Sequence, residues 1–199
     1  TELRHRTAAM IDPLTGIANR RSFLHEAGVL AARHRGTPRP TAVLLVDLDH
    51  FKTINDRFGH ALGDRVLEIF TAAARRSIRA SDLIGRIGGE EFASVLYDTS
   101  QEKAVAVAER IREAFAQSAQ EVDGRPVCAT VSIGLVHYDG AALNVSELLA
   151  QADQALYFAK ESGRNRVEVA SLDMLLERKD KVETASANAL ASIAVQRVA

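Results

Sequence analysis

The chain has 199 residues, of which 47% are hydrophobic and 26% charged, and its formal net charge is −1. This length suffices for one well-packed domain with about thirty residues to spare, and the composition is that of an ordinary soluble globular protein. The near-zero charge argues against proteins that capture nucleic acid or anionic membranes by bulk electrostatics, because those carry a large basic excess. A local basic cluster for a small phosphorylated ligand remains compatible with it.

The single cysteine, Cys128, cannot form an internal disulfide and lies in an apolar run, 127–136, that we interpret as a strand. We expect it to be buried as a small hydrophobic residue in a reduced, cytoplasmic chain. No apolar run has the length of a membrane span, and the first residues lack the apolar segment of a secretory signal. We therefore expect no membrane insertion of this segment, although a longer parent protein could be attached to a membrane through upstream domains.

The first part of the chain predicts a buried strand that follows helical segments. Residues 1–11 suit the end of an incoming helix or linker, and Asn19 is placed to cap the next helix. Residues 41–48 form a near-continuous apolar run, as expected for a central strand covered on both faces. Asp47 and Asp49 lie at its end, where a rigid element at the edge of the core is a good place for a metal ligand.

The middle of the chain predicts a connection, a helix, a hairpin and a second helix. Residues 51–63 are interpreted as the connecting stretch, and a helix is expected from about residue 64 to residue 79. After the hairpin, Thr99 and Glu102 resemble a capping box, which predicts a helix that continues to about residue 117.

The last third predicts a strand at 127–136, a helix and a short final strand at 164–169. Asn144 opens the helix as a capping residue, and Gly163 is well placed as the first residue beyond its end. Residues 171–199 show no clean apolar stripe, and we interpret them as an appended helix or a frayed tail.

The hairpin sequence Gly88-Gly89-Glu90-Glu91-Phe92 stands between the apolar runs 83–87 and 92–97. A glycine pair at the tip can adopt the positive φ values of a tight primed turn and leaves the backbone open to a ligand. Adjacent carboxylates are unusual in a plain hairpin, because like charges repel and Glu is depleted in strands. The pentapeptide therefore has two interpretations, a solvated surface turn or a site for a metal cation with an anionic ligand.

Charged groups elsewhere favour the second interpretation. If the strand that carries Asp47 lies beside the hairpin, its carboxylate and that of Glu90 converge as oxygen ligands for divalent cations. Lys160 and Arg164, four residues apart at a helix end, could then neutralise phosphate oxygens. No P-loop or dinucleotide-binding glycine motif is present in the sequence.

Several segments, in order and spacing, resemble the GGDEF family of diguanylate cyclases. They are Asp12-Pro13-Leu14-Thr15-Gly16-Ile17-Ala18-Asn19-Arg20-Arg21, Val46-Asp47-Leu48-Asp49-His50-Phe51-Lys52, Ile54-Asn55-Asp56, Phe58-Gly59-His60, Gly88 to Phe92, Ala159-Lys160 and Gly163-Arg164-Asn165. The signature pentapeptide stands here in its Glu form, GGEEF. The resemblance spans residues 12 to about 169 and identifies 12–170 as the catalytic domain, with 1–11 as an incoming helix or linker and 171–199 as a tail.

The resemblance implies an α+β fold related to adenylyl cyclase catalytic domains, with a mostly antiparallel five-stranded sheet surrounded by helices. It implies condensation of two GTP into cyclic di-GMP with release of pyrophosphate. Each protomer of a two-fold dimer would hold one GTP, so that each 3′-hydroxyl attacks the α-phosphate of the other nucleotide.

The resemblance also implies a site for Mg²⁺ or Mn²⁺, with two ions in each half-site. The implied ligands are Asp47, Glu90, Glu91 and the backbone carbonyl of Leu48, and Glu90 would also assist deprotonation of the 3′-hydroxyl. For Asp49 two interpretations stay open, a direct ligand or a structural carboxylate that bonds nearby backbone.

The implied nucleotide contacts come from four parts of the chain. Guanine would be recognised by Asn55 and Asp64, whose amide and carboxylate suit its N–H and carbonyl edge. The phosphates would be contacted by lysine and arginine side chains, and the glycine pair would let ribose and phosphates lie close to the backbone: Lys52, Lys160, Arg164, Gly88 and Gly89.

A second implied site binds the product. Arg79 and Asp82 match the family's RxxD feedback-inhibition motif, and Arg110 matches a supplementary arginine there. By chance alone, an RxxD motif is common, and Arg near a helix C-terminus is favoured by the helix dipole.

Three functions are compatible with these residues: an active cyclase regulated by an upstream sensor or receiver domain, a catalytically silent module that senses cyclic di-GMP, and an enzyme that makes mixed cyclic dinucleotides. The intact carboxylates favour the cyclase. An enzyme that makes mixed cyclic dinucleotides is disfavoured because Asp64 keeps a partner suited to guanine.

Overall fold

The computed structural model describes residues 10–33 and 35–171. The tail expected beyond residue 171 and most of the expected incoming helix lie outside these residues. Within the described part, Met10 is in a turn and Ile11 forms an isolated antiparallel bridge with Ala18, so the chain is already non-helical at the end of the segment expected to be an incoming helix.

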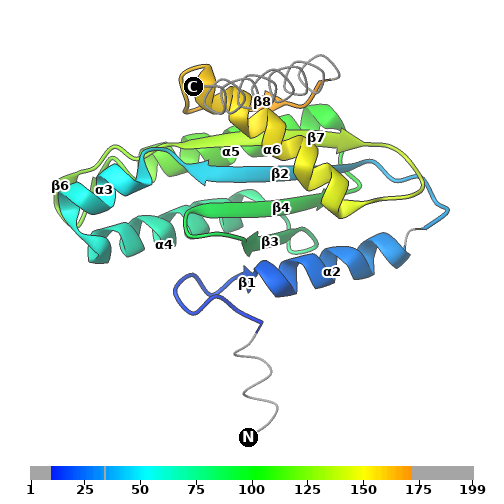
Figure 1. Cartoon of the computed structure of the whole chain (residues 1–199), viewed down its shortest axis with the longest axis horizontal. Coiled ribbons are helices and arrows are strands. Elements are labelled where there is room, and N and C mark those ends of the chain that lie inside the picture. Colours follow the sequence, from blue (N-terminus) through cyan, green and yellow to red (C-terminus); the bar gives the residue numbers. More distant parts are fainter. Residues whose placement is uncertain (1–9, 34, 172–199) are drawn as a thin grey trace, which may run out of the picture.

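A single main sheet organises the described part of the chain (Figure 1). Its six strands lie in the order β1 (Ala18–Asn19), β3 (Leu83–Arg86), β4 (Glu91–Tyr97), β2 (Thr41–Leu48), β7 (Val131–Tyr138) and β8 (Val167–Val169). The pairs β3–β4, β4–β2 and β2–β7 are antiparallel, whereas β1 and β8 run parallel to their neighbours. The mostly antiparallel α+β fold is thus confirmed, with one strand more than expected. That strand, β1, has two residues and is too short to give a periodic signal.

Five helices cover the two faces of this sheet within the described residues. They are α2 (Arg20–Arg33), α3 (Phe51–Phe58), α4 (His60–Ser77), α5 (Gln101–Ser118) and α6 (Val145–Glu161). Helices α3, α4 and α5 pack into one hydrophobic cluster, and α2 and α6 pack into another on the opposite face. Figure 1 shows α6 crossing in front of the sheet, with α4 and α5 behind it. A small hairpin, β5 (Glu121–Val122) and β6 (Arg125–Pro126), follows α5.

The central strand β2 is buried along its whole length, as its continuous apolar sequence predicts. Leu44, Val46 and Leu48 belong to the cluster under α4 and α5, whereas Val43 and Leu45 belong to the cluster under α2 and α6. Because side chains alternate along a strand, Asp47 continues the second set and lies on the α6 face.

The helix ends that carry sequence signals lie where those signals predict, except that one capping residue is shifted by one position. Asn19 accepts from the Ser22 N–H over 3.0 Å, and Asn144 accepts from two N–H groups at the start of α6. Gly163, just beyond α6, has a φ of 113°, a value that favours glycine. The expected cap Thr99 is wrong by one residue: Ser100 accepts from the Lys103 N–H, three residues on.

Two other expectations are corrected. The stretch 51–63 is not a loose connection, because it contains α3 and the first turn of α4, separated by Gly59 at a φ of 87°. Strand β7 begins at Val131, and Cys128 precedes it as an exposed residue with a φ of 54°. The Cys128 thiol therefore belongs to an irregular connection rather than to the core. Among the described helices, none has the length and apolarity needed to cross a bilayer.

Candidate active site

The end of β2 lies directly beside the acidic hairpin. Asp47 is the register partner of Glu91 on β4, and the Leu48 N–H donates to the Glu90 carbonyl oxygen over 3.3 Å. Partners in an antiparallel pair point to the same face, so two carboxylates stand opposite each other where like charges normally destabilise a sheet. A cation between or beside the two carboxylates relieves this repulsion.

Lys160 supplies one such cation from the last turn of α6. Its Nζ lies 2.9 Å from Asp47 Oδ1, and Asp47 is only 7% exposed. Burial raises the pKa of Asp47 above its ordinary value, and the hydrogen bond and charge of Lys160 offset this only in part. Arg164, just beyond the helix, also acts on Asp47 as a positive charge. The structure therefore brings Asp47 together with Lys160 and Arg164, which lie far from it in the sequence.

Glu90 belongs to the same electrostatic group. Its pKa is raised by partial burial first and by the negative charge of Asp47 second, while Lys160 lowers it. A carboxyl group with a raised pKa is a stronger base than an exposed one, which suits proton abstraction.

These oxygen atoms fit a magnesium site that the substrate completes. In the described part of the chain, no three acidic, histidine or cysteine side chains are gathered into a ready metal cage. Mg²⁺ is commonly held by one or two carboxylates together with substrate phosphates rather than by an all-protein cage. Asp47 and Glu90, with the nearby Glu91 and the Leu48 backbone, offer oxygen atoms suited to such a site.

The expected guanine contacts lie on α3 and α4. Lys52 and Asp64 are exposed, whereas the Asn55 Oδ1 is buried without a hydrogen-bond partner. A buried acceptor without a partner is costly, and a ligand N–H would satisfy it. Gly63 packs against this amide, because a Cβ at that position would overlap Asn55 Oδ1. Gly63 was not singled out from the sequence.

The two hairpin glycines differ from each other and from the expectation. Neither has a φ in the left-handed region, so the expected primed turn at Gly88-Gly89 is wrong. A Cβ at Gly88 would meet the Glu91 side chain, whereas a Cβ at Gly89 would project into open space. A side chain at Gly88 would therefore displace the Glu91 carboxylate, whereas Gly89 leaves the tip open to an approaching group.

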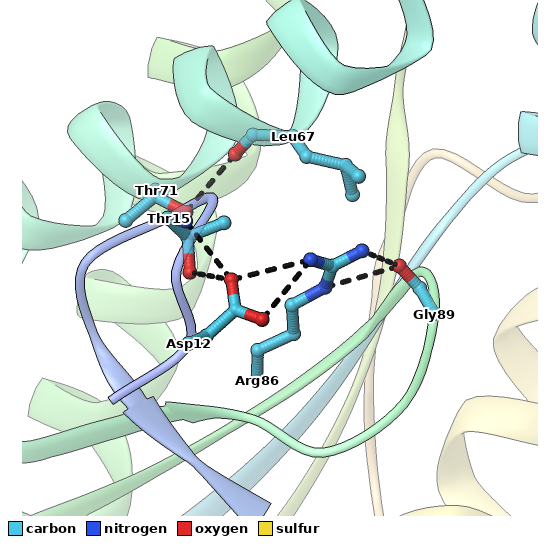
Figure 2. A network of polar contacts seen from close by, with 6 residues as sticks. All are labelled: Asp12, Thr15, Leu67, Thr71, Arg86 and Gly89. Atoms are coloured by element: carbon cyan, nitrogen blue, oxygen red, sulfur yellow. Dashed lines mark hydrogen bonds and ion pairs between the residues drawn. The ribbon is translucent and has the colours of Figure 1, made fainter. Parts of the chain in front are cut away.

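Arg86 is bonded to the hairpin tip, as Figure 2 shows. Its Nε and one terminal nitrogen donate to the Gly89 carbonyl oxygen over 3.2 and 2.6 Å. The other terminal nitrogen lies 3.2 Å from an Asp12 oxygen. Burial alone would raise the pKa of Asp12, but hydrogen bonds from Thr15 and the charge of Arg86 outweigh it and lower the pKa. The turn at residues 12–16 is thereby tied to the hairpin.

Comparison with known proteins identifies this arrangement. The family model described as "Diguanylate cyclase, GGDEF domain" matches residues 9–166. The chain belongs to the GGDEF family. Its membership explains why Asp12, Asp47 and the acidic hairpin occur at these spacings in one domain.

Relatives of this GGDEF chain include named cyclases. The "Probable diguanylate cyclase DgcT" of Escherichia coli (strain K12) is 44% identical over 164 residues, which cover 79% of this chain and 35% of that protein. "Response regulator PleD" of Caulobacter vibrioides (strain NA1000 / CB15N) is 42% identical over 161 residues, 80% of this chain and 36% of that protein. The chain thus spans about a third of the length of these relatives.

A solved structure shares the fold of this GGDEF chain. The coiled coil and GGDEF domain of DgcB from Caulobacter crescentus, in complex with c-di-GMP, matches with a TM-score of 0.78 at 28% identity. The match covers 84% of this chain and 89% of that one.

The RxxD residues of the GGDEF domain lie away from the acidic hairpin, around a pocket of about 200 Å³. Arg79, Asp82 and Arg110 all line it, together with Lys103. Asp82 accepts from the backbone N–H of Arg79 over 2.9 Å, and Arg110 donates to the Ser77 carbonyl oxygen. The structure therefore brings these three predicted residues together.

Sequence reasoning missed the supporting residues of the GGDEF site. Arg86 lies in an apolar run that predicts only a strand, and Asp12 lies in a motif that assigns it no contact. The available signal is a charged residue inside an apolar run, two positions before Gly88.

Proposed function

We propose that this chain is a diguanylate cyclase, which joins two GTP molecules into cyclic di-GMP and releases one pyrophosphate from each. The observation that carries this proposal is the convergence of Asp47, Glu90 and Lys160 at the meeting point of β2, the hairpin and α6. Carboxylates and cations at one point suit phosphoryl transfer, in which positioning and charge stabilisation do most of the catalysis.

The residues divide the work by their chemistry. Mg²⁺ or Mn²⁺, two per half-site, would be held by Asp47, Glu90, Glu91 and the Leu48 carbonyl oxygen and would neutralise charge on the phosphates. Glu90 accepts the proton of the 3′-hydroxyl as its oxygen attacks the α-phosphorus of the second nucleotide, from which pyrophosphate leaves.

The remaining contacts hold the nucleotide. Lys160 and Arg164, with Lys52 on α3, neutralise the phosphate oxygens. Asn55 and Asp64 bind the guanine edge, and the buried, unpartnered Oδ1 of Asn55 supports this assignment. One chain holds one nucleotide, so two chains related by a two-fold axis complete the reaction.

The direct test is incubation of the protein with GTP and Mg²⁺, with the product resolved by chromatography. We expect cyclic di-GMP and two equivalents of pyrophosphate, with a rate per chain that rises with protein concentration because two half-sites must meet. If no cyclic dinucleotide forms even when two copies are fused to an upstream dimerising domain, the proposal fails.

We expect the Gly63→Ala variant to bind GTP about tenfold more weakly than the wild type, equivalent to about 1.4 kcal/mol. The added methyl group would displace the Asn55 amide, the nearest atom to a Cβ at that position. The affinity is measured by calorimetry with a GTP analogue that cannot be cleaved between the α- and β-phosphates. Gly28→Ala on α2 is the matched control, since a Cβ there meets no atom within 4 Å; equal affinities in both variants would contradict the assignment of Asn55.

We further propose that the pocket around Arg79, Asp82 and Arg110 binds cyclic di-GMP and inhibits turnover. The Arg79→Ala variant is then expected to keep its initial rate of GTP conversion while losing inhibition by added product. The alternative function, a silent cyclic di-GMP sensor, rests on the same pocket and makes the opposite prediction. A sensor would bind cyclic di-GMP through Arg79 without converting GTP in either variant.

The domains around this segment are also part of the proposal. We expect an upstream sensor or receiver domain to control pairing of two 12–170 domains.

A further inference from the structure

The turn that carries Arg164 has an uncommon backbone conformation. Arg164 and Asn165 have φ values of 63° and 46°, so two consecutive non-glycine residues lie in the left-handed region. Such residues are disfavoured sterically and persist where surrounding contacts hold them. The turn follows Gly163 at the end of α6 and leads into β8, so its shape decides where Arg164 projects relative to Asp47.

Asp49 is the first contact that holds this turn. Its Oδ2 accepts from the backbone N–H of Asn165 over 3.0 Å and from the Thr130 hydroxyl over 2.7 Å. Its Oδ1 accepts from the Ser132 hydroxyl over 2.7 Å. Asp49 is 4% exposed, and both its oxygens are engaged. A carboxylate used in this way is anchored to protein groups rather than presented to a metal.

Arg112 is the second contact, and it reaches the same turn from α5 on the other helical layer. One terminal nitrogen donates to the Asn165 side-chain oxygen over 3.0 Å. The rest of the guanidinium is held by Glu109 over 2.6 Å and by Glu113 over 3.3 Å. Asn165 is thus fixed through its backbone by Asp49 and through its side chain by Arg112.

Asp49 lies just beyond the end of β2, two residues from Asp47, and Asn165 is next to Arg164. The hydrogen bond between Asp49 and Asn165 therefore couples the end of β2 to the basic turn. Arg164 acts on Asp47 as a positive charge in this arrangement.

We propose that Asp49 and Arg112 are positioning residues that clamp the Arg164–Asn165 turn, and that they set where the Arg164 guanidinium meets the nucleotide phosphates. This inference rests on the proposed function. It also decides between the two interpretations of Asp49, in favour of a structural carboxylate with a specific purpose.

The first experiment is a double-mutant cycle between Arg112 and Arg164. Arg112→Gln is expected to weaken binding of a non-hydrolysable GTP analogue about fivefold and to raise the KM for GTP similarly, with kcat nearly unchanged. In an Arg164→Ala background, Arg112→Gln should have no further effect, because the group it positions is gone. Glu113→Gln is the matched control, since it removes one ion pair of Arg112 without touching the turn.

An equal loss from Arg112→Gln in both backgrounds would overturn the proposal, because Arg112 would then act on something other than Arg164. An unchanged affinity in Arg112→Gln would overturn it too. Melting temperatures of all variants distinguish a loss of positioning from a general loss of folding. A loss of folding would lower kcat, because fewer molecules are active, and would leave the analogue affinity of the folded molecules unaltered.

The second experiment compares Asp49→Asn with Asp49→Ala. The asparagine oxygen can accept from Thr130 and Asn165 while its amide donates to the Ser132 oxygen, so this variant should keep the analogue affinity within about twofold. Asp49→Ala loses all three bonds and should weaken binding about tenfold; if it does not fold, the Arg112 cycle carries the test.

Metal dependence distinguishes the remaining interpretation of Asp49. If Asp49→Asn raises the Mg²⁺ concentration needed for half-maximal activity as much as Asp47→Asn does, Asp49 is a ligand and the proposal is wrong. The substitutions at Arg112 and Asp49 could change the affinity for the GTP analogue as expected while the wild type forms no cyclic dinucleotide. In that case the proposed reaction fails and the positioning role stands.

Discussion

Replacing Glu90 by glutamine is expected to lower the rate of cyclic di-GMP formation about 1000-fold, because one change removes both the proposed proton acceptor and a proposed negative oxygen ligand. Glutamine keeps the size of the side chain and its ability to accept a hydrogen bond, so the hairpin should stay folded. Initial rates of pyrophosphate release at saturating GTP and Mg²⁺ measure the effect.

The control for this prediction is Glu121→Gln, a substitution of an exposed residue in the small β5–β6 hairpin. It changes the net charge of the protein by the same amount and should leave the rate unaltered. A Glu90→Gln variant with more than a tenth of the wild-type rate would rule out Glu90 as the proton acceptor.

Replacing Arg86 by alanine is expected to lower turnover about 100-fold, because it releases the hairpin tip that carries Glu90. The guanidinium bonds the Gly89 carbonyl oxygen twice and pairs with Asp12, and its side chain is only 16% exposed. A displacement of a reacting group by about 1 Å is sufficient for a loss of that size. Loss of the charged hydrogen bonds should also cost about 2 kcal/mol of unfolding free energy and lower the melting temperature by about 6 °C.

Arg39→Ala is the matched control for Arg86. Arg39 forms the same kind of arginine–carboxylate ion pair with Asp98, but both side chains are exposed to solvent. The pair therefore contributes little to the free energy of unfolding. We expect its stability and turnover to stay close to the wild type. If Arg86→Ala and Arg39→Ala behave alike, the hairpin does not depend on the network of Figure 2.

Much of the fold follows from local sequence signals. The continuous apolar run of β2 predicts a strand buried on both faces, and the caps Asn19 and Asn144 mark where helices begin. One failed prediction concerns regular structure, because the connection expected at 51–63 contains α3 and the first turn of α4. Others concern short or irregular segments. The two-residue β1 has no period to detect, and Cys128 lies before β7 because its backbone adopts a positive φ that no hydrophobic pattern encodes.

The residues of the candidate site also fall into two groups, those that the sequence reveals and those that only the structure reveals. The side chains to which we assign the proposed chemistry, such as Asp47, Glu90 and Lys160, are recognisable from their types and spacing along the chain. The residues that hold these side chains in place are not recognisable in this way. Arg86 lies close to the hairpin in sequence, but its partner Asp12 is 74 positions away. Gly63 contacts Asn55 on the preceding helix, and Arg112 contacts Asn165, 53 positions away, so no spacing rule relates these residues to those partners.

The sequence by itself therefore determined the family, the type of fold and the identity of the charged groups, because these depend on residue type and local order. Only the tertiary structure decided that Asp47 faces Glu91 across two strands and pairs with Lys160 on α6. It also decided that Asp49 bonds the turn of Asn165, 116 positions away in the chain. The register of the sheet and the packing of α6 on it set these contacts, and both arise from long-range burial that no local pattern specifies.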